Sequence, residues 1–266
     1  MSLTACAALV EAGDPDRFAA AMAAPPPARA RLWPLYALNL ELARAPWASA
    51  EPLVAEMRLQ WWVDTLDLID AGQRPQTHEV AGPLADLIAE TGQPMAPLQA
   101  MAEARRRECL GEPFADEAEL LAYLADTAGK LMLAAGQALE APEAAHPVLQ
   151  DAGLAGGIAN WLVAVPELIA RGRAPLPAAA PDAAPDAAPA AIAALARHGL
   201  ASLARARKAR RALPAAALPA LYPAWQAGAI LSRAAAEPAR VTEGALRLPE
   251  VSRRGRLLLA ALTGRI

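Results

Sequence analysis

Proline and glycine residues divide this sequence into segments of helical length. The 266 residues include 25 prolines and 16 glycines, and the segments between them are rich in alanine, which has the highest helix propensity. No segment alternates several valine, isoleucine or threonine residues with polar ones, as a half-buried strand would. The sequence therefore predicts an all-α protein. Helices are expected over residues 15–23, 28–45, 49–72, 80–91, 95–110, 116–139, 144–170, 189–212, 215–235 and 249–263.

Several of these helices carry recognisable start and stop signals. Asp14 is a predicted N-cap with Pro15 at the first helical position, where the missing N–H of proline costs nothing. Ser49 and Asp116 are predicted to cap two later helices, and Gly72 to end the helix that Ser49 begins.

A low-complexity stretch interrupts the helical pattern in the second half of the chain. Residues 174–190, "APLPAAAPDAAPDAAPA", contain small side chains that cannot bury enough surface to offset the entropy of ordering. We expect one domain over residues 1–266, with residues 174–190 as a flexible connector within it.

Composition excludes several classes of protein. The net charge of −3 and pI near 5.7 give no general reason to expect nucleic acid as a partner. Cys6 and Cys109 form no disulfide or thiolate-metal pattern, and the three histidines, His78, His146 and His198, lack zinc-ligand spacing. The N-terminus does not resemble a signal peptide, and no run of about 18 uninterrupted apolar residues predicts a membrane span. A cytoplasmic location is expected.

Two kinds of charged segment have alternative interpretations. Asp64, Asp67 and Asp70 lie three residues apart on one predicted helix, which fits a solvated helix face better than a metal site. Arginine runs at residues 105–107 and 205–211 are also typical of solvated faces. The second run is nevertheless a candidate for weak contact with an anionic membrane surface, peripheral to the inner membrane, because it adjoins the connector in an acidic chain.

Four ordered segments resemble the squalene/phytoene synthase family. They are "LWPLYALNLELAR", "EPLVAEMRLQWWVDTL", "EARRRECLGEPFADEAELLAYLADTAGKLMLAAG" and "GLAGGIANWLVAVPELIARGRAPLP". The resemblance implies an isoprenoid (terpenoid) synthase-like helical bundle around a central cavity. It also implies Mg²⁺ held by two aspartate-rich segments on facing helices, because ionising a diphosphate requires several cations held by carboxylates.

The positions that the resemblance assigns to those aspartates hold other residues here. In an ungapped alignment they fall on Ala43, Arg44 and Trp47 in the first segment, and on Ala164, Glu167 and Leu168 in the second. Only Glu167 keeps a carboxylate. We therefore expect no cofactor, no metal-ligating residue and no catalytic residue.

Eleven residues are expected to surround the inherited chamber. Arg44 is predicted either to hold one anionic group by bidentate hydrogen bonds or to pair with Glu167 and close the site. The full set is Tyr36, Asn39, Glu41, Arg44, Trp62, Tyr123, Gly129, Asn160, Glu167, Arg171 and Arg173.

Two functions from different classes remain open. The first is a non-catalytic isoprenoid-binding or respiratory-complex assembly protein, because the sequence resembles most closely the degenerate branch that includes the mitochondrial complex I assembly factor. Its partners would be an isoprenoid or other apolar ligand, or a respiratory-complex subunit. The alternative is an active prenyl-diphosphate head-to-head synthase in which displaced acids such as Asp64 and Asp67 bind Mg²⁺.

Overall fold

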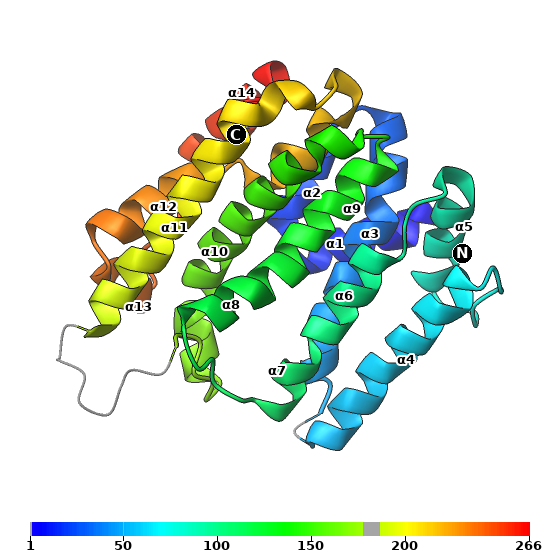
Figure 1. Ribbon diagram of the computed structural model, residues 1–266, viewed down its shortest axis with the longest axis horizontal. Helices are drawn as coiled ribbons and strands as arrows, with labels where there is room; N and C mark the ends of the chain where they lie inside the picture. The colour runs from blue at the N-terminus through cyan, green and yellow to red at the C-terminus, as the bar shows by residue number, and fades with distance from the viewer. Residues whose placement is uncertain (1, 50, 178–186) are drawn as a thin grey trace.

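Every regular element that the structure describes is helical (Figure 1). The structure is a computed structural model and describes residues 2–49, 51–177 and 187–266. The α-helices are α1 (Leu3–Gly13), α2 (Pro15–Met22), α3 (Pro26–Arg44), α4 (Pro52–Asp70), α5 (Ala81–Thr91), α6 (Ala96–Ala104), α7 (Arg106–Leu110), α8 (Glu117–Leu124), α9 (Lys130–Ala138), α10 (His146–Ala170), α11 (Ala187–Ala209), α12 (Ala227–Ala236), α13 (Ala239–Thr242) and α14 (Glu250–Thr263). Shorter elements are η1 (Ala45–Trp47), η2 (Ala125–Gly129), η3 (Glu143–Ala145), η4 (Arg210–Ala212) and η5 (Ala215–Ala224).

The helices stand side by side around α10, which is the centre of the bundle (Figure 1). On one side α10 packs against α11 and α12, and on the other against α9 and η2. Beyond α9 lie α3 and α6, and α4 packs against α6 at the far edge. This order puts the end of α3 and the second half of α10 within one bundle, as the family resemblance requires.

The start and stop signals are largely confirmed. The side chain of Asp14 accepts a hydrogen bond from the Arg17 N–H at 3.0 Å, and that of Asp116 from the Glu119 N–H at 2.8 Å. Gly72 follows the end of α4 with φ +69°, a conformation that glycine adopts without strain. Ser49 was placed wrongly as the cap of α4: its hydroxyl accepts from the Glu51 N–H at 3.0 Å, but the helix begins at Pro52.

Two expected long helices are interrupted. The segment 95–110 is broken at Arg105, whose N–H bonds to the carbonyl of Ala102, an i−3 bond that tightens the last turn of α6. The segment 116–139 contains a π-helical turn at η2. The Thr127 hydroxyl donates to the Tyr123 carbonyl at 2.8 Å and provides that oxygen with a partner where the regular ladder changes.

Three further boundaries differ from the sequence-based expectation. Residues 215–224 form a 3-10 run and not an α-helix, because Pro219 and Pro223 lack the N–H groups that an α-helical ladder needs. Helix α1 was not expected. The predicted connector 174–190 lies mostly outside the described residues, and α11 begins inside it at Ala187.

Helix α10 is the apolar core of the bundle. By length and composition, Glu143–Ala170 could cross a membrane, and its packing against helices on both sides accounts for the same apolar composition. A Cβ added to Gly153 would lie 2.8 Å from the Ala128 carbonyl oxygen, and one added to Gly157 would lie 2.7 Å from the Ala128 side chain. The "GLAGG" stretch, residues 153–157, is therefore a close helix-packing site.

Candidate functional site

The end of α3 and the end of α10 meet at an indole ring. Trp47, in η1, is half-buried, and the guanidinium carbons of Arg171 and Arg173 lie 5.0 and 4.9 Å from its ring centroid. Both distances are within the range of a cation–π interaction. The position that the resemblance assigns to a metal-binding aspartate is therefore occupied by an aromatic ring in contact with two cations.

The two carboxylates of the predicted site each have an arginine partner. Glu41 is buried in α3, and its Oε2 lies 3.3 Å from Nη2 of Arg58 on α4. Glu167 is exposed, and its Oε1 lies 2.5 Å from Nη2 of Arg171, one turn later on α10. These pairs compensate the two charges separately and do not bring the acids together.

The predicted ion pair between Arg44 and Glu167 is wrong. Glu167 pairs within its own helix, because Arg171 lies at i+4 where a helical neighbour is within reach. Arg44 is exposed and extends toward Gly13, where an added Cβ would lie 2.6 Å from its Nη2. Whether Arg44 holds an anionic group stays a prediction.

Aromatic side chains fill the space beside Trp47. Tyr123 is buried, with ring centroids of Phe114 and Trp161 at 5.4 and 5.6 Å, and its hydroxyl donates to Glu108. Burial raises the pKa of Tyr123 well above its ordinary value, although the nearby Arg105 opposes this. The phenol is therefore a neutral hydrogen-bond donor at physiological pH.

The cavity that remains among these groups is small. It encloses about 40 Å³ and is bordered by Trp47, Phe114, Trp161, Leu168 and Arg173. Cavities that hold drug-sized ligands have volumes of about 300–1,000 Å³, and about 30 Å³ is one water's share of the liquid. A prenyl chain does not fit in this space.

A second hollow on the other side of α10 is large enough for a ligand. It measures about 360 Å³ and lies between α2, α10, α12 and the segment that leads into α14. Its apolar lining is Ala159, Val163, Ala164, Pro223, Ala227, Ile230 and Leu248, and its polar lining is Asp14, Asp16, Arg17, Asn160, Glu167, Gln226, Arg247 and Arg253. The lining is about half apolar and half polar, so the hollow offers both apolar contacts and hydrogen-bonding groups to a ligand.

Several polar groups that line this 360 Å³ hollow form hydrogen bonds or ion pairs with one another. The Arg17 Nε lies 2.8 Å from Oδ2 of Asp14, and the Gln226 amide donates to Asp16 at 2.9 Å. Arg253 also pairs with Asp16. Asn160 and Glu167, both predicted from the sequence, line this hollow, whereas Arg173 lines the small cavity.

Four other predicted site residues lie in the packed interior. Tyr36 is buried beneath the Arg17 guanidinium, 5.2 Å from its ring centroid, and within the described residues its hydroxyl has no hydrogen-bond partner. Burial raises the pKa of Tyr36 above its ordinary range. Asn39 is buried in α3, and Trp62 is buried against Trp61, with ring centroids 4.9 Å apart. Gly129 is a packing position, since the Cα of this residue lies 2.8 Å from a Cβ added to Gly153.

Mg²⁺ does not fit the donor set of this site. Across residues 2–49, 51–177 and 187–266, no three His, Cys, Asp or Glu side chains gather closely enough to hold a metal ion. The alternative acids are also separate, because Asp64 accepts from Gln60 at 2.6 Å and Asp67 accepts from Gln99 at 2.9 Å. A diphosphate-binding metal cluster needs several converging carboxylates, so we assign no step to Mg²⁺.

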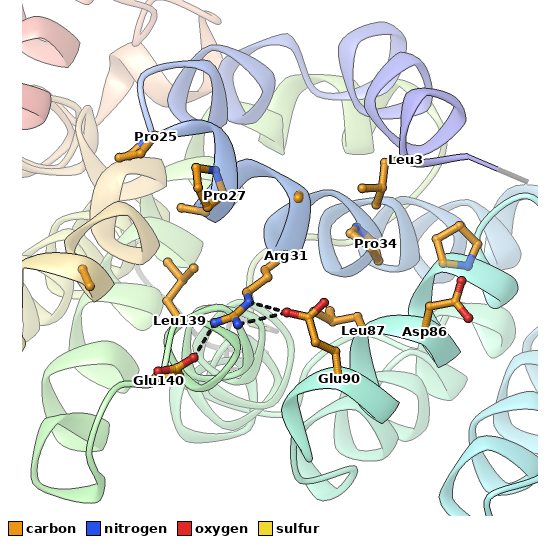
Figure 2. Close-up of a pocket in the computed structure, with 14 residues that line it drawn as sticks. Leu3, Pro25, Pro27, Arg31, Pro34, Asp86, Leu87, Glu90, Leu139 and Glu140 are labelled. Carbon is orange, nitrogen blue, oxygen red and sulfur yellow. Dashed lines mark hydrogen bonds and ion pairs between the residues drawn. The ribbon is translucent and has the colours of Figure 1, made fainter.

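A larger hollow of about 680 Å³ lies on the outer side of α3 (Figure 2). Arg31 extends into it, with Nη2 2.9 Å from Glu90 and Nη1 2.7 Å from Glu140 (Figure 2). Pro34, Pro83 and other apolar residues complete the lining. None of the residues predicted from the sequence borders this hollow, whereas Asn160 and Glu167 line the hollow beside α10, so the latter is the better candidate site.

Sequence reasoning missed the residues of α2 and α12 that complete the candidate site. Asp16 and Gln226 lie 210 positions apart, and their contact depends on the packing of α2 beside η5 and α12. The sequence around Asp14 predicts a helix cap, and the structure confirms it. The same residues give no indication of the hollow beside the cap.

The geometry can be compared with known proteins. The all-helical bundle has the isoprenoid synthase fold of two solved structures. A dehydrosqualene synthase in complex with a ligand is 15% identical, with a TM-score of 0.80 over 97% of this chain and 94% of that chain. Squalene synthase HpnC from Alicyclobacillus acidocaldarius is 18% identical, with a TM-score of 0.75 over 91% of this chain and 94% of that chain.

Sequence comparison identifies the family. The squalene/phytoene synthase family matches residues 10–255, which is most of the chain. A search of curated protein sequences gave no significant match. The chain belongs to the squalene/phytoene synthase family, and the predicted fold class and family are confirmed.

Proposed function

We propose that this protein is a non-catalytic member of the squalene/phytoene synthase family that binds an isoprenoid in the 360 Å³ hollow beside α10. One observation carries the proposal. Trp47 contacts Arg171 and Arg173 where the family resemblance places a metal-binding aspartate, and Glu41 and Glu167 are each paired with an arginine. Losing one well-placed electrostatic group commonly raises a reaction barrier by about 3–4 kcal/mol, so losing most of two sets is expected to abolish turnover.

Product analysis tests the loss of catalysis. Purified protein is incubated with Mg²⁺ and farnesyl or geranylgeranyl diphosphate, and the extract is analysed for hydrocarbon. We expect none. A squalene-like or phytoene-like product would contradict the proposal and support the alternative, an active head-to-head prenyl synthase that uses Mg²⁺.

Thermal denaturation tests isoprenoid binding. A ligand at 100 times its dissociation constant stabilises the folded state by about 2.7 kcal/mol, and we expect farnesol or farnesyl diphosphate to raise the melting temperature equally with and without Mg²⁺. Ala164→Trp fills the hollow and should remove the shift, whereas Ala170→Trp, on an exposed position of the same helix, should retain it. A shift that Ala164→Trp leaves unchanged would place the ligand elsewhere.

A role in respiratory-complex assembly is the second part of the proposal. It is supported by the resemblance of "RLQWW", residues 58–62, to the family branch that includes the complex I assembly factor. The test is a strain that lacks the gene, assayed for assembled NADH dehydrogenase on native gels. We expect less assembled complex and restoration by the wild-type gene. Normal assembly in the deletion strain would refute this role and leave the isoprenoid proposal intact.

A further inference from the structure

Helix α14 exposes a continuous stripe of large apolar side chains. Val251 is 84% exposed, Leu258 61%, Leu259 54% and Leu262 76%. Residues spaced by 7, 8 and 11 positions lie on the same side of an α-helix. The stripe therefore forms one surface and is not a scatter of single apolar residues.

The opposite side of α14 is packed on the bundle. Ala260 is fully buried, and Leu257 and Ala261 pack partly buried against the core. The Tyr222 hydroxyl donates to the Ala261 carbonyl at 3.3 Å, and Arg253 pairs with Asp16 on α2. These contacts fix the orientation of the helix, so the leucine stripe faces outward, and nothing in the described chain covers it. Figure 1 shows α14 at the outer edge of the molecule, near α11.

An arginine-lined hollow adjoins the stripe. It measures about 440 Å³ and lies between the ends of α11 and α14, and Leu259 belongs to both the stripe and the hollow. Gly264, with φ +64°, ends α14 here, and an added Cβ would lie 2.6 Å from Nη1 of Arg210. The lining consists of Arg207, Arg210, Trp225, Arg256, Leu259, Arg265 and Ile266.

No aspartate or glutamate compensates the positive charge of this hollow. Within the described residues none of its four arginines has an Asp or Glu oxygen within 4.0 Å. Arg207 donates to the Ile266 main-chain oxygen at 2.7 Å. Burial and repulsion from Arg256 lower the pKa of Arg207, as expected where cations gather without an anion.

Two acids on α10 and α14 already have arginine partners. Asp151 pairs with Arg205 at 2.6 Å, and Glu250 pairs with Arg253 and Arg254 at 3.0 and 2.8 Å. The edge is therefore basic in a protein whose net charge is −3.

We infer that the outer face of α14 and the adjoining arginine hollow dock on the surface of an anionic lipid bilayer. Leucines on one face of a surface helix, bordered by arginines, are the pattern of helices that lie in the bilayer interface with their apolar side among the acyl chains. The arginines then meet lipid phosphates, each cation near the surface strengthening binding about fivefold. This inference does not depend on isoprenoid binding.

Vesicle co-sedimentation of the full chain tests the inference. We expect binding to phosphatidylcholine vesicles that contain phosphatidylglycerol, much weaker binding to phosphatidylcholine alone, and loss of the difference at high salt because exposed charges are screened. No farnesyl compound is present, so failure here is separate from failure of the proposed function. Equal binding to both vesicle types, or none to either, would overturn the inference.

Two double variants separate the apolar and charged contributions. Leu258→Ser with Leu262→Ser should lower binding about 10- to 100-fold, because two leucines no longer enter the acyl region. Arg256→Gln with Arg265→Gln should lower binding to anionic vesicles about 25-fold. The control is Leu53→Ser with Met57→Ser on α4, where the side chains are 70% and 65% exposed, and this variant should bind as the wild type does.

A fluorescent label locates the contact directly. Both native thiols are buried, so a dye that attaches at Leu262→Cys should not attach to Cys6 or Cys109. We expect a blue shift on adding anionic vesicles, and none for the same dye at Met57→Cys. No shift at Leu262→Cys, or a serine variant that becomes monomeric from an oligomer yet keeps vesicle binding, would show that the stripe has another occupant and would overturn the inference.

Discussion

The two arginine-rich surfaces of this molecule differ in what surrounds their guanidinium groups. At the end of α10, Arg171 and Arg173 lie on the Trp47 ring, and Arg171 also pairs with Glu167. At the end of α11, Arg207 and Arg210 have no Asp or Glu partner within the described chain. Arginine content alone therefore does not define an anion site. The groups around the arginines decide whether an anion can bind. At the end of α10 the arginines already contact Trp47 and Glu167, whereas at the α14 edge they have no Asp or Glu partner.

The same contrast applies to apolar packing. Helix α10 meets its neighbours so closely that glycines are needed at the contact, whereas α14 leaves four large apolar side chains in solvent. Well-packed interior positions are sensitive to every added atom, and exposed ones are not. The following predictions test this difference between the α10 interior and the molecular surface.

The largest effect is expected at Gly153 on α10. Gly153→Ala should lower the free energy of unfolding by about 3 kcal/mol, because the new Cβ meets main-chain atoms that cannot move aside. The control is Gly156→Ala, whose Cβ would lie 3.7 Å from Ala224 and which should be neutral or stabilise by up to about 1 kcal/mol. Chemical denaturation measures both, and equal effects would refute the close contact.

Removing the indole of Trp47 should have the next largest effect. Trp47→Ala is expected to cost about 2 kcal/mol of unfolding free energy, since a half-buried ring and two cation–π contacts are lost. Trp47→Phe keeps an aromatic face and should recover about half of that loss. If both variants unfold like the wild type, the arginine contacts do not stabilise the closed site.

The buried thiol of Cys6 gives a pH-dependent prediction. Burial, with a smaller contribution from Glu79, raises the pKa of Cys6 from 9.0 to about 11. A folded-state pKa above the unfolded value means that this contribution to stability is complete below pH 9 and is lost as the pH rises to about 11. The expected loss is about 1–2 kcal/mol over that interval.

A difference measurement isolates this group from the buried tyrosines, whose raised pKa values also make stability depend on alkaline pH. Cys6→Ala should flatten the alkaline part of the stability curve measured by urea denaturation. Parallel curves for the wild type and Cys6→Ala between pH 9 and 11 would contradict the predicted coupling. An exposed thiol, introduced as Leu262→Cys on α14, should cause no such loss in the same interval.

The smallest effects are expected for single ion pairs. Arg58→Gln should lower stability by about 1 kcal/mol, because the buried Glu41 loses a charged partner. Arg254→Gln, in the exposed pair with Glu250 on α14, should leave the melting temperature unchanged, since exposed pairs contribute little. A larger effect at Arg254 than at Arg58 would reverse the proposed difference between interior and edge.

The sequence predicted those features that short-range chemistry determines. The N-caps at Asp14 and Asp116 are confirmed because a cap depends on its own side chain and an N–H three residues later. The sequence does not predict the interruption at Arg105 or the π-turn. A 3-10 or π turn differs little from an α-helical turn in local propensity, so packing against other helices determines which one forms.

The candidate site was harder to predict because it depends on tertiary contacts. An alignment shows which residues, Ala43, Trp47, Ala164 and Leu168, stand where the resemblance places aspartates. It does not show the pairing of Glu167 with Arg171, since Arg44 is an equally charged candidate. The outward stripe of α14 was also hidden. Leu257, Leu258 and Leu259 are consecutive, and only the packing of Ala260 shows which side faces the core.

The π-turn at η2 changes the register between α8 and α9. It contains one more residue than an α-helical turn would, and each residue of an α-helix advances by about 100° around the axis. Deleting one residue from 125–129 would give a straight helix and rotate everything before it by that angle relative to α9. Tyr123 would then turn away from Glu108, so the aromatic packing beside Trp47 depends on the one extra residue of this turn.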